Sequence, residues 1–135
     1  MKKLIFLKIV LVLTGIYIVL SGLNIAAGGM LTLGWGGSKD FFTVTNQKAY
    51  LIQDSHVRFV GGVWLALGLF FIWSVTNVYR YLPQLLFACI LVFVGGLCRL
   101  FQPDGATFHM PVLGSFLAEL VGMPVLFIWL QKSVR

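Results

Sequence analysis

Four stretches of the chain are apolar over the length of a membrane-spanning helix, and this pattern limits the fold more than any single motif does. They run from about residue 4 to 27, 57 to 78, 83 to 101 and 111 to 130. A helix needs about 20 apolar residues to cross the hydrocarbon core of a bilayer. Because a spanning segment must satisfy its own backbone hydrogen bonds, these stretches predict helices. The expected fold is an all-α bundle of four transmembrane helices.

The composition agrees with a membrane protein. Of the 135 residues, 59% are hydrophobic and 10% are charged, against about 45–50% and about 25% in soluble domains. The four spans use most of the length, so we expect residues 1–135 to form a single domain. The net charge is +6 at pH 7, but most basic residues flank the spans, where they orient a membrane protein. We therefore expect the lipid bilayer as the surroundings and no nucleic acid as a partner.

Basic residues on the short flanks predict the orientation. These residues are Lys2, Lys3 and Lys8 before or at the start of the first span, Arg80 between the second and third, and Lys132 and Arg135 after the fourth. The positive-inside rule places these flanks in the cytoplasm, so we expect a bacterial inner-membrane protein with both termini cytoplasmic. The start MKKLIFLKIVLVL is also similar to a signal peptide. Its apolar run is longer than the h-region of about 7–15 residues and ends in no A-x-A site, so we expect an uncleaved anchor.

The first loop, from Gly28 to His56, is the longest segment outside the predicted spans and lies on the outer side. Gly28 and Gly29 are expected to end the first helix, and Asp54 or Ser55 to cap the second. The second half of the loop, TNQKAYLIQDSHVRF, could form a short amphipathic helix on the outer interface that leads into the second span. Two interpretations stay open for the loop as a whole: a lid over a site, and a solvated connector on the lipid headgroups.

Two motifs, RFVGG at residues 58–62 and GGLCR at residues 95–99, place an arginine about one helical turn from a glycine pair. Because the second helix runs inward and the third runs outward, both arginines are expected near the outer interface, with the glycines one turn deeper. Spacings of three and four put each arginine on the face of its glycines. The residues are Arg58 with Gly61 and Gly62, and Arg99 with Gly95 and Gly96.

Glu119 is the only carboxylate well inside a predicted span. It follows Pro111 by eight residues, which places it about 12 Å below the outer end of its helix. A charge facing lipid at that depth costs about 2.5–3.5 kcal/mol on insertion scales, so we expect Glu119 to face the bundle, with Ser115 on the same face. We predict an outward-opening polar site formed by Arg58, Arg99 and Glu119 and lined by the glycine pairs and Ser115.

The charges of this site favour an anionic ligand. Two arginines and one glutamate sum to +1, which suits a carboxylate, a phosphate or a lipid headgroup. The residues expected around the mouth are Asp54, His56, Gln102, Asp104 and His109. The two histidines could bind a metal with Asp54 or Asp104, but their spacing matches no metal motif, so we expect neither metal nor cofactor.

Each element of the predicted site also has a structural interpretation. Arginines near helix ends often extend their side chains to the membrane interface. Glycine pairs in membrane helices usually serve packing. Glu119 could be held by one arginine as a structural ion pair.

The stretch RFVGGVWLALGL, the third helix ending in GGLCRLF and the segment FLAELVGMPVL around the glutamate resemble a widespread group of small four-helix bacterial membrane proteins. This group is classed only as a domain of unknown function. The resemblance covers nearly the whole chain and implies four spans, but it implies no particular activity. The positions that match are Arg58, Gly61, Gly62, Arg99 and Glu119.

Three classes of function stay open. The first is a non-catalytic membrane protein that binds an anionic lipid, an amphiphile or a partner subunit, as a homo-oligomer or within a larger complex. The second is a proton-coupled small-molecule transporter with Glu119 as relay, which would need oligomerisation because the chain has four spans. The third is an enzyme on a lipid-soluble substrate, with Glu119 as general acid or base. The sequence contains no GxSxG, HExxH or CxxC motif, so we expect the first class and no catalytic residue.

Overall fold

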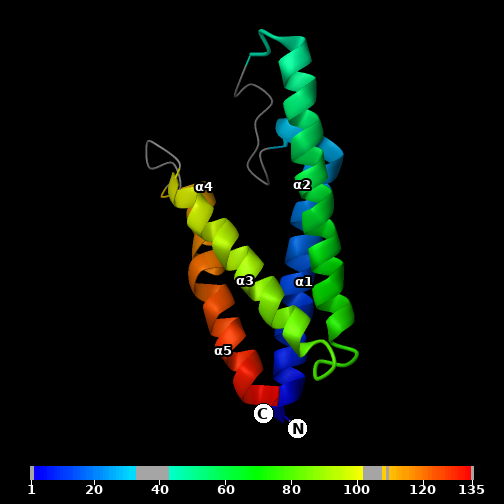
Figure 1. Cartoon of the computed structure of the whole chain (residues 1–135), viewed down its shortest axis with the longest axis vertical. Coiled ribbons are helices and arrows are strands. Elements are labelled where there is room, and N and C mark those ends of the chain that lie inside the picture. Colours follow the sequence, from blue (N-terminus) through cyan, green and yellow to red (C-terminus); the bar gives the residue numbers. More distant parts are fainter. Residues whose placement is uncertain (1, 33–42, 102–107, 109, 135) are drawn as a thin grey trace. The chain divides into compact units, whose positions relative to one another are not determined.

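The structure is a computed structural model of the chain and describes residues 2–32, 43–101, 108 and 110–134. The regular structure in these ranges is helical (Figure 1). Four helices there are long and apolar enough to cross a bilayer, over Lys3–Leu31, Gln47–Ser74, Leu82–Phe101 and Val112–Ser133. This confirms the predicted all-α membrane fold with four spanning helices.

The helices form two compact units. The N-terminal unit comprises Lys8–Val75, and the C-terminal unit comprises Thr76–Arg135 together with Met1–Leu7. Each unit is a helical hairpin (Figure 1). We use the term loop end for the end of each hairpin where the chain passes from one arm to the other.

The N-terminal unit contains α1 (Lys2–Gly28) from Lys8 onward, the 3₁₀ turn η1 (Gly29–Leu31) and α2 (Gln47–Ser74). α1 ends where predicted, because Gly29 has a φ of 60°, which glycine adopts without strain. α2 begins earlier than predicted. Its cap is Asn46, whose side chain accepts a hydrogen bond from the backbone N–H of Ala49 at 3.1 Å. Asp54 and Ser55, which we expected to cap α2, therefore lie inside it.

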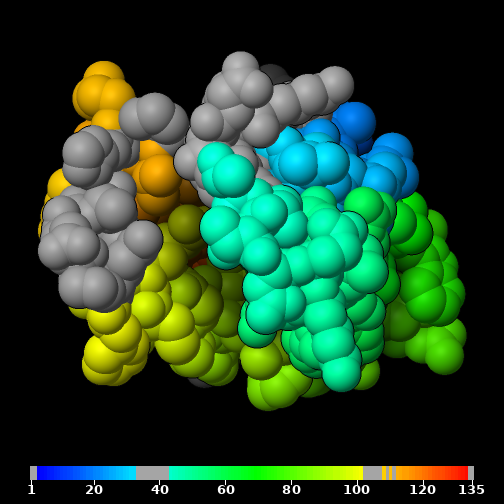
Figure 2. All heavy atoms as spheres, turned by 90° about the horizontal axis from the view of Figure 1, so that it is seen from above, coloured from blue at the N-terminus to red at the C-terminus, as the bar shows by residue number. Residues whose placement is uncertain are grey.

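The polar first turns of α2 are continuous with its apolar part, so the segment predicted as a short amphipathic helix leading into the second span forms the first turns of α2. Most side chains from Gln47 to Gln53 are exposed. Figure 2 shows this end of α2 in turquoise, uncovered on the face that is seen. The glycine-rich part of the first loop, residues 33–42, lies outside the described residues, so the lid interpretation stays a prediction.

The two arms of the N-terminal unit approach closely at glycines spaced seven residues apart. These are Gly15 and Gly22 on α1, and Gly61 and Gly68 on α2. A Cβ atom built at Gly22 would lie 2.3 Å from the backbone N of Leu65. One built at Gly61 would lie 2.4 Å from the backbone N of Ala26. The absence of side chains at these positions lets the two backbones pack directly against each other.

The C-terminal unit contains α3, a 3₁₀ turn, α4, a π-helical turn and α5. Their bounds are Leu82–Cys98 for α3, Arg99–Phe101 for η3, Met110–Leu117 for α4, Ala118–Gly122 for the π-helical turn η5, and Met123–Val134 for α5. Pro83 lies in the first turn of α3, where its missing N–H needs no helical partner. α4, η5 and α5 follow one another directly and run antiparallel to α3 (Figure 1).

The core of the C-terminal unit follows steps of three and four residues on both arms. α3 contributes Leu85, Cys89, Val92 and Gly96. The other arm contributes Phe116, Glu119, Met123, Leu126 and Leu130. Such steps keep residues on one face of a helix. Glu119 thus occupies a position in a buried stripe that is otherwise apolar.

The turn η5 interrupts the α-helical bonding pattern beside Glu119. The backbone N–H of Met123 donates to Ala118 O, five residues back. Pro124 follows, and a proline ring clashes with the carbonyl four residues earlier, here that of Leu120. A wider turn just before the proline relieves this clash. The position of Pro124 in the sequence therefore accounts for the position of the π-helical turn.

Candidate functional site

Arg99 and Glu119 form an ion pair with two hydrogen bonds in the C-terminal unit. Arg99 Nε donates to Glu119 Oε2 at 2.7 Å, and Arg99 Nη2 donates to Glu119 Oε1 at 2.8 Å. The Glu119 side chain is 11% exposed and the Arg99 side chain is 40% exposed. Charge-assisted bonds in this bidentate arrangement are among the strong ones. The buried carboxylate therefore holds the guanidinium in a defined position at the loop end of the unit.

Gly96 makes room for this pair. A Cβ atom built at Gly96 would lie 2.8 Å from Glu119 Cβ and 3.4 Å from Glu119 Oε2. Arg99 follows three residues later, which places it on the same helical face. The missing side chain at Gly96 thus lets Glu119 pack against α3 directly below the guanidinium of Arg99.

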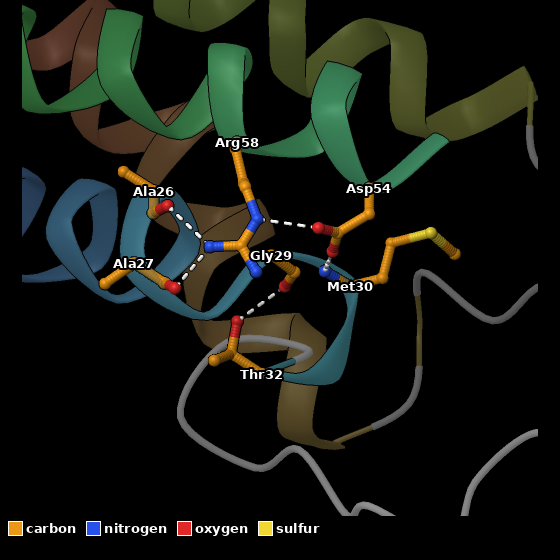
Figure 3. Close-up of polar contacts among 7 residues, drawn as sticks. All are labelled: Ala26, Ala27, Gly29, Met30, Thr32, Asp54 and Arg58. Atoms are coloured by element: carbon orange, nitrogen blue, oxygen red, sulfur yellow. Dashed lines mark hydrogen bonds and ion pairs between the residues drawn. The ribbon is translucent and has the colours of Figure 1, made fainter. Parts of the chain in front are cut away.

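Arg58 belongs to the N-terminal unit and pairs with Asp54, one turn earlier on α2 (Figure 3). Arg58 Nε donates to Asp54 Oδ2 at 2.6 Å. Arg58 Nη1 donates to Ala26 O at 3.2 Å and also to Ala27 O. The last carbonyls of a helix have no helical donors and carry partial negative charge. The guanidinium of Arg58 therefore caps the C-terminal end of α1.

Asp54 completes this cap from the same helix. Its Oδ1 accepts the backbone N–H of Met30 at 2.8 Å. A Cβ atom built at Gly29 would lie 2.0 Å from that oxygen. Position 29 therefore accepts only glycine. Thr32 Oγ1 donates to Gly29 O at 2.8 Å. Asp54 and Arg58 of α2 are thus both engaged in fastening the end of α1 at the loop end of the hairpin (Figure 3).

Comparison with known proteins identifies the family of the chain. A family model described as "Domain of unknown function (DUF4345)" matches residues 3–130. The chain belongs to this family. No curated protein and no solved structure matched the chain. Membership confirms the resemblance seen in the sequence. Because the DUF4345 description names no activity, the geometry of the two ion pairs is what bears on function.

The four predicted site glycines of this DUF4345 chain have different surroundings. Gly61 packs against α1, and Gly96 packs against Glu119. Gly62 and Gly95 have nothing within 4 Å of the point where a Cβ atom would stand. One glycine of each pair is therefore required by a close contact, and its neighbour is not.

Of the remaining predicted residues, Ser115 and His56 lie within helices. Ser115 donates its hydroxyl to Val112 O at 2.8 Å, within α4. His56 is exposed on α2. The other residues expected around the mouth, Gln102, Asp104 and His109, lie outside the described residues. The hydroxyl of Ser115 thus bonds to its own helix.

The predicted net charge of +1 was the sum of Arg58, Arg99 and Glu119, in which Glu119 was the only acid. The structure adds Asp54, which pairs with Arg58 as Glu119 pairs with Arg99. The convergence of Arg58 with the Arg99–Glu119 pair in one site stays a prediction. A signal for the Asp54 pairing exists in the sequence, since an acid and an arginine four residues apart pair on a helix. It was missed because Asp54 or Ser55 was expected to cap the helix.

Within residues 2–32, 43–101, 108 and 110–134, no group of three His, Cys, Asp or Glu residues could hold a metal ion. What the C-terminal unit does offer is a guanidinium with a fixed orientation and partial exposure. Such a planar group of N–H donors matches carboxylate and phosphate oxygens. The arrangement is therefore suited to recognising an anionic group.

Proposed function

We propose that this chain is a non-catalytic membrane protein that binds the anionic headgroup of a lipid or other amphiphile at Arg99. The observation that carries the proposal is that Glu119 fixes the orientation of the Arg99 guanidinium. Two hydrogen bonds of 2.7 and 2.8 Å fix it, while the Arg99 side chain stays 40% exposed. A group that is fixed beforehand loses less entropy when a ligand binds. Arg99 is then the binding residue and Glu119 the positioning residue.

Stability alone is a weaker explanation for the pair. Replacing a buried ion pair by apolar residues of similar volume is often neutral or stabilising, and the positions beside Glu119 in the buried stripe, Phe116 and Met123, are apolar. Ionisable residues inside spans mark functional sites more often than not. π-Helical turns are also frequent at functional sites. The presence of Arg99 and Glu119 in this setting therefore favours a functional role.

The transporter and the enzyme are less well supported by the same geometry. A relay or a general acid needs Glu119 to take up a proton, and each uptake would disturb the two hydrogen bonds from Arg99. A partner subunit that presents its own carboxylate to Arg99 would use the chemistry proposed for the headgroup. Titration with lipid distinguishes a lipid headgroup from a partner subunit as the ligand of Arg99, because a bound subunit would compete with the lipid for Arg99.

The double variant Arg99→Gln/Glu119→Gln is expected to bind phosphatidylglycerol at least about tenfold more weakly than the wild type, because a hydrogen bond to a charged group contributes about 1.5–3 kcal/mol. The double variant leaves no unpaired charge in the span. Native mass spectrometry of the protein titrated with phosphatidylglycerol or phosphatidylcholine measures the affinities.

Arg80→Gln is the matched control for this titration. Arg80 is an exposed arginine in the turn between α2 and α3, 5.7 Å from the ring centre of Tyr81. Its replacement is expected to leave binding of phosphatidylglycerol unchanged. Equal affinity of the wild type for both lipids, or an equal loss in the control and the double variant, would contradict the proposal.

We also propose that the loops after the first and third spans lie on the outer side of a bacterial inner membrane. The support is the cluster of basic residues on the flanks that include both termini. In a background without Cys89 and Cys98, Lys39→Cys is expected to react with a membrane-impermeant maleimide in intact cells. Lys132→Cys is expected to react only after permeabilisation. The reverse labelling pattern would invert the proposed topology.

A further inference from the structure

Two backbone carbonyls in η5, those of Glu119 and Leu120, lack the donors that an α-helix would provide. In an α-helix, Glu119 O accepts the N–H of Met123, and Leu120 O accepts the N–H of residue 124. Here the N–H of Met123 donates to Ala118 O. Residue 124 is a proline and has no N–H. The turn η5 therefore leaves Glu119 O and Leu120 O, two consecutive acceptors, without their regular helical partners.

Near this level the described part of the facing arm brings Arg99 as a donor, and its Nε and Nη2 donate to the carboxylate of Glu119. Gly96 of α3 lies against Glu119, and the segment from Ile90 to Leu97 contains only aliphatic residues, one phenylalanine and glycines. On the arm that carries η5, the hydroxyl of Ser115 donates to Val112 O. In a bilayer core an unpaired carbonyl is strongly unfavourable, because the lipid chains supply no donor. A hydroxyl donor from the surroundings of the unit would therefore relieve this cost.

We propose that Glu119 O and Leu120 O bind a hydroxyl group, supplied by a water molecule or by the alcohol of a membrane amphiphile. Carbonyl oxygens accept hydrogen bonds, so the ligand must donate one, and an anion would be repelled. A cation fits less well, because the guanidinium of Arg99 already neutralises the nearby carboxylate. The site lies further from the loop end than the headgroup contact proposed for Arg99. It goes beyond that contact and does not depend on it.

Isotope-edited infrared spectroscopy of the full-length protein tests this proposal. Cys98, at the end of α3, permits ligation of a synthetic C-terminal segment to the expressed N-terminal part without changing the sequence. A ¹³C=¹⁸O label is placed at Glu119, at Leu120 or, as the matched control, at Ala118, whose carbonyl accepts the N–H of Met123. The carbonyl stretching frequency of each label falls when its oxygen accepts a hydrogen bond.

The expected result is a response at Glu119 and Leu120 that the control label does not show. If water is the ligand, both bands lie lower in hydrated bilayers than in dried films, while the Ala118 band does not move. If an alcohol is the ligand, dried films show the lower frequency only with added diacylglycerol, which has a free hydroxyl, and not with triacylglycerol. The proposal is overturned if both bands match the Ala118 band, or stay at the unbonded frequency, under all these conditions.

Pro124→Ala provides a second test, because alanine restores an N–H that can donate to Leu120 O. The variant is expected to abolish the response of the Leu120 label to hydration or to added alcohol. The Ala118 band is expected to stay unchanged. A response at Leu120 that survives in a folded Pro124→Ala protein would overturn the assignment of that carbonyl. If the variant does not fold, the wild-type spectra decide.

Discussion

Gly61→Ala is expected to destabilise the protein by about 3 kcal/mol, the upper end of the usual cost of inserting bulk into a packed interface. The new methyl group would lie 2.4 Å from the backbone N of Ala26 and 2.8 Å from the carbonyl carbon of Ile25. Backbone atoms of a packed helix cannot turn aside as the end of a side chain can. α1 and α2 would have to separate along their contact, so the loss affects the whole N-terminal hairpin.

Gly62→Ala is the matched control, since it makes the same chemical change one residue further along α2. Nothing lies within 4 Å of the point where its methyl group would stand. Alanine favours a helix over glycine by about 1 kcal/mol, so stability is expected to stay the same or to rise slightly. Unfolding of both variants in lipid bicelles, followed by circular dichroism or steric trapping, measures the difference. Equal effects of the two substitutions would show that the close contact at Gly61 is not present in the membrane.

Arg99→Gln is expected to destabilise the protein more than Glu119→Gln does. Removing Arg99 leaves a carboxylate that is 11% exposed without its charged partner, and breaking a buried pair in this way costs about 3–5 kcal/mol. Removing the charge of Glu119 leaves an arginine that is 40% exposed. Its long side chain can extend to the membrane interface, so the expected loss is only about 1 kcal/mol.

A double-mutant cycle in the same unfolding assay measures the coupling within this pair. Arg99→Gln/Glu119→Gln is expected to be more stable than Arg99→Gln alone, because the two amides can hydrogen-bond to each other and no unpaired charge remains. Similar losses for the two single variants, together with simple additivity in the double variant, would show that Glu119 does not hold Arg99.

The number and type of the main elements could be predicted without a structure. The apolar runs are long enough for helices and too long for buried strands, and backbone groups in a bilayer must be paired within the segment. The end of α1 was also predictable, because Gly29 can adopt the positive φ that ends a helix there. The four helices depend on the composition of stretches of about 20 residues, and the end of α1 depends on the backbone conformations that one glycine can adopt.

The start of α2 was predicted wrongly for an identifiable reason. The apolar run begins near Val57, but α2 begins at Gln47. Hydropathy marks where a helix can enter the bilayer, and a helix can continue beyond that point through polar residues. Because Asp54 was placed at a helix end, its spacing of four residues from Arg58 was not recognised as an ion pair on one helical face.

The sequence by itself determined four apolar helices, the stop after α1, and the presence of two arginines and a glutamate within or beside the spans. Only the tertiary structure decided that Arg58 meets the end of α1, and that Arg99 meets Glu119. It also decided that Gly61 and Gly96 are contact positions while their neighbours are not. The physical reason is register. A shift of one residue turns a helical side chain by about 100°, and the register between two helices is set by packing along their whole contact.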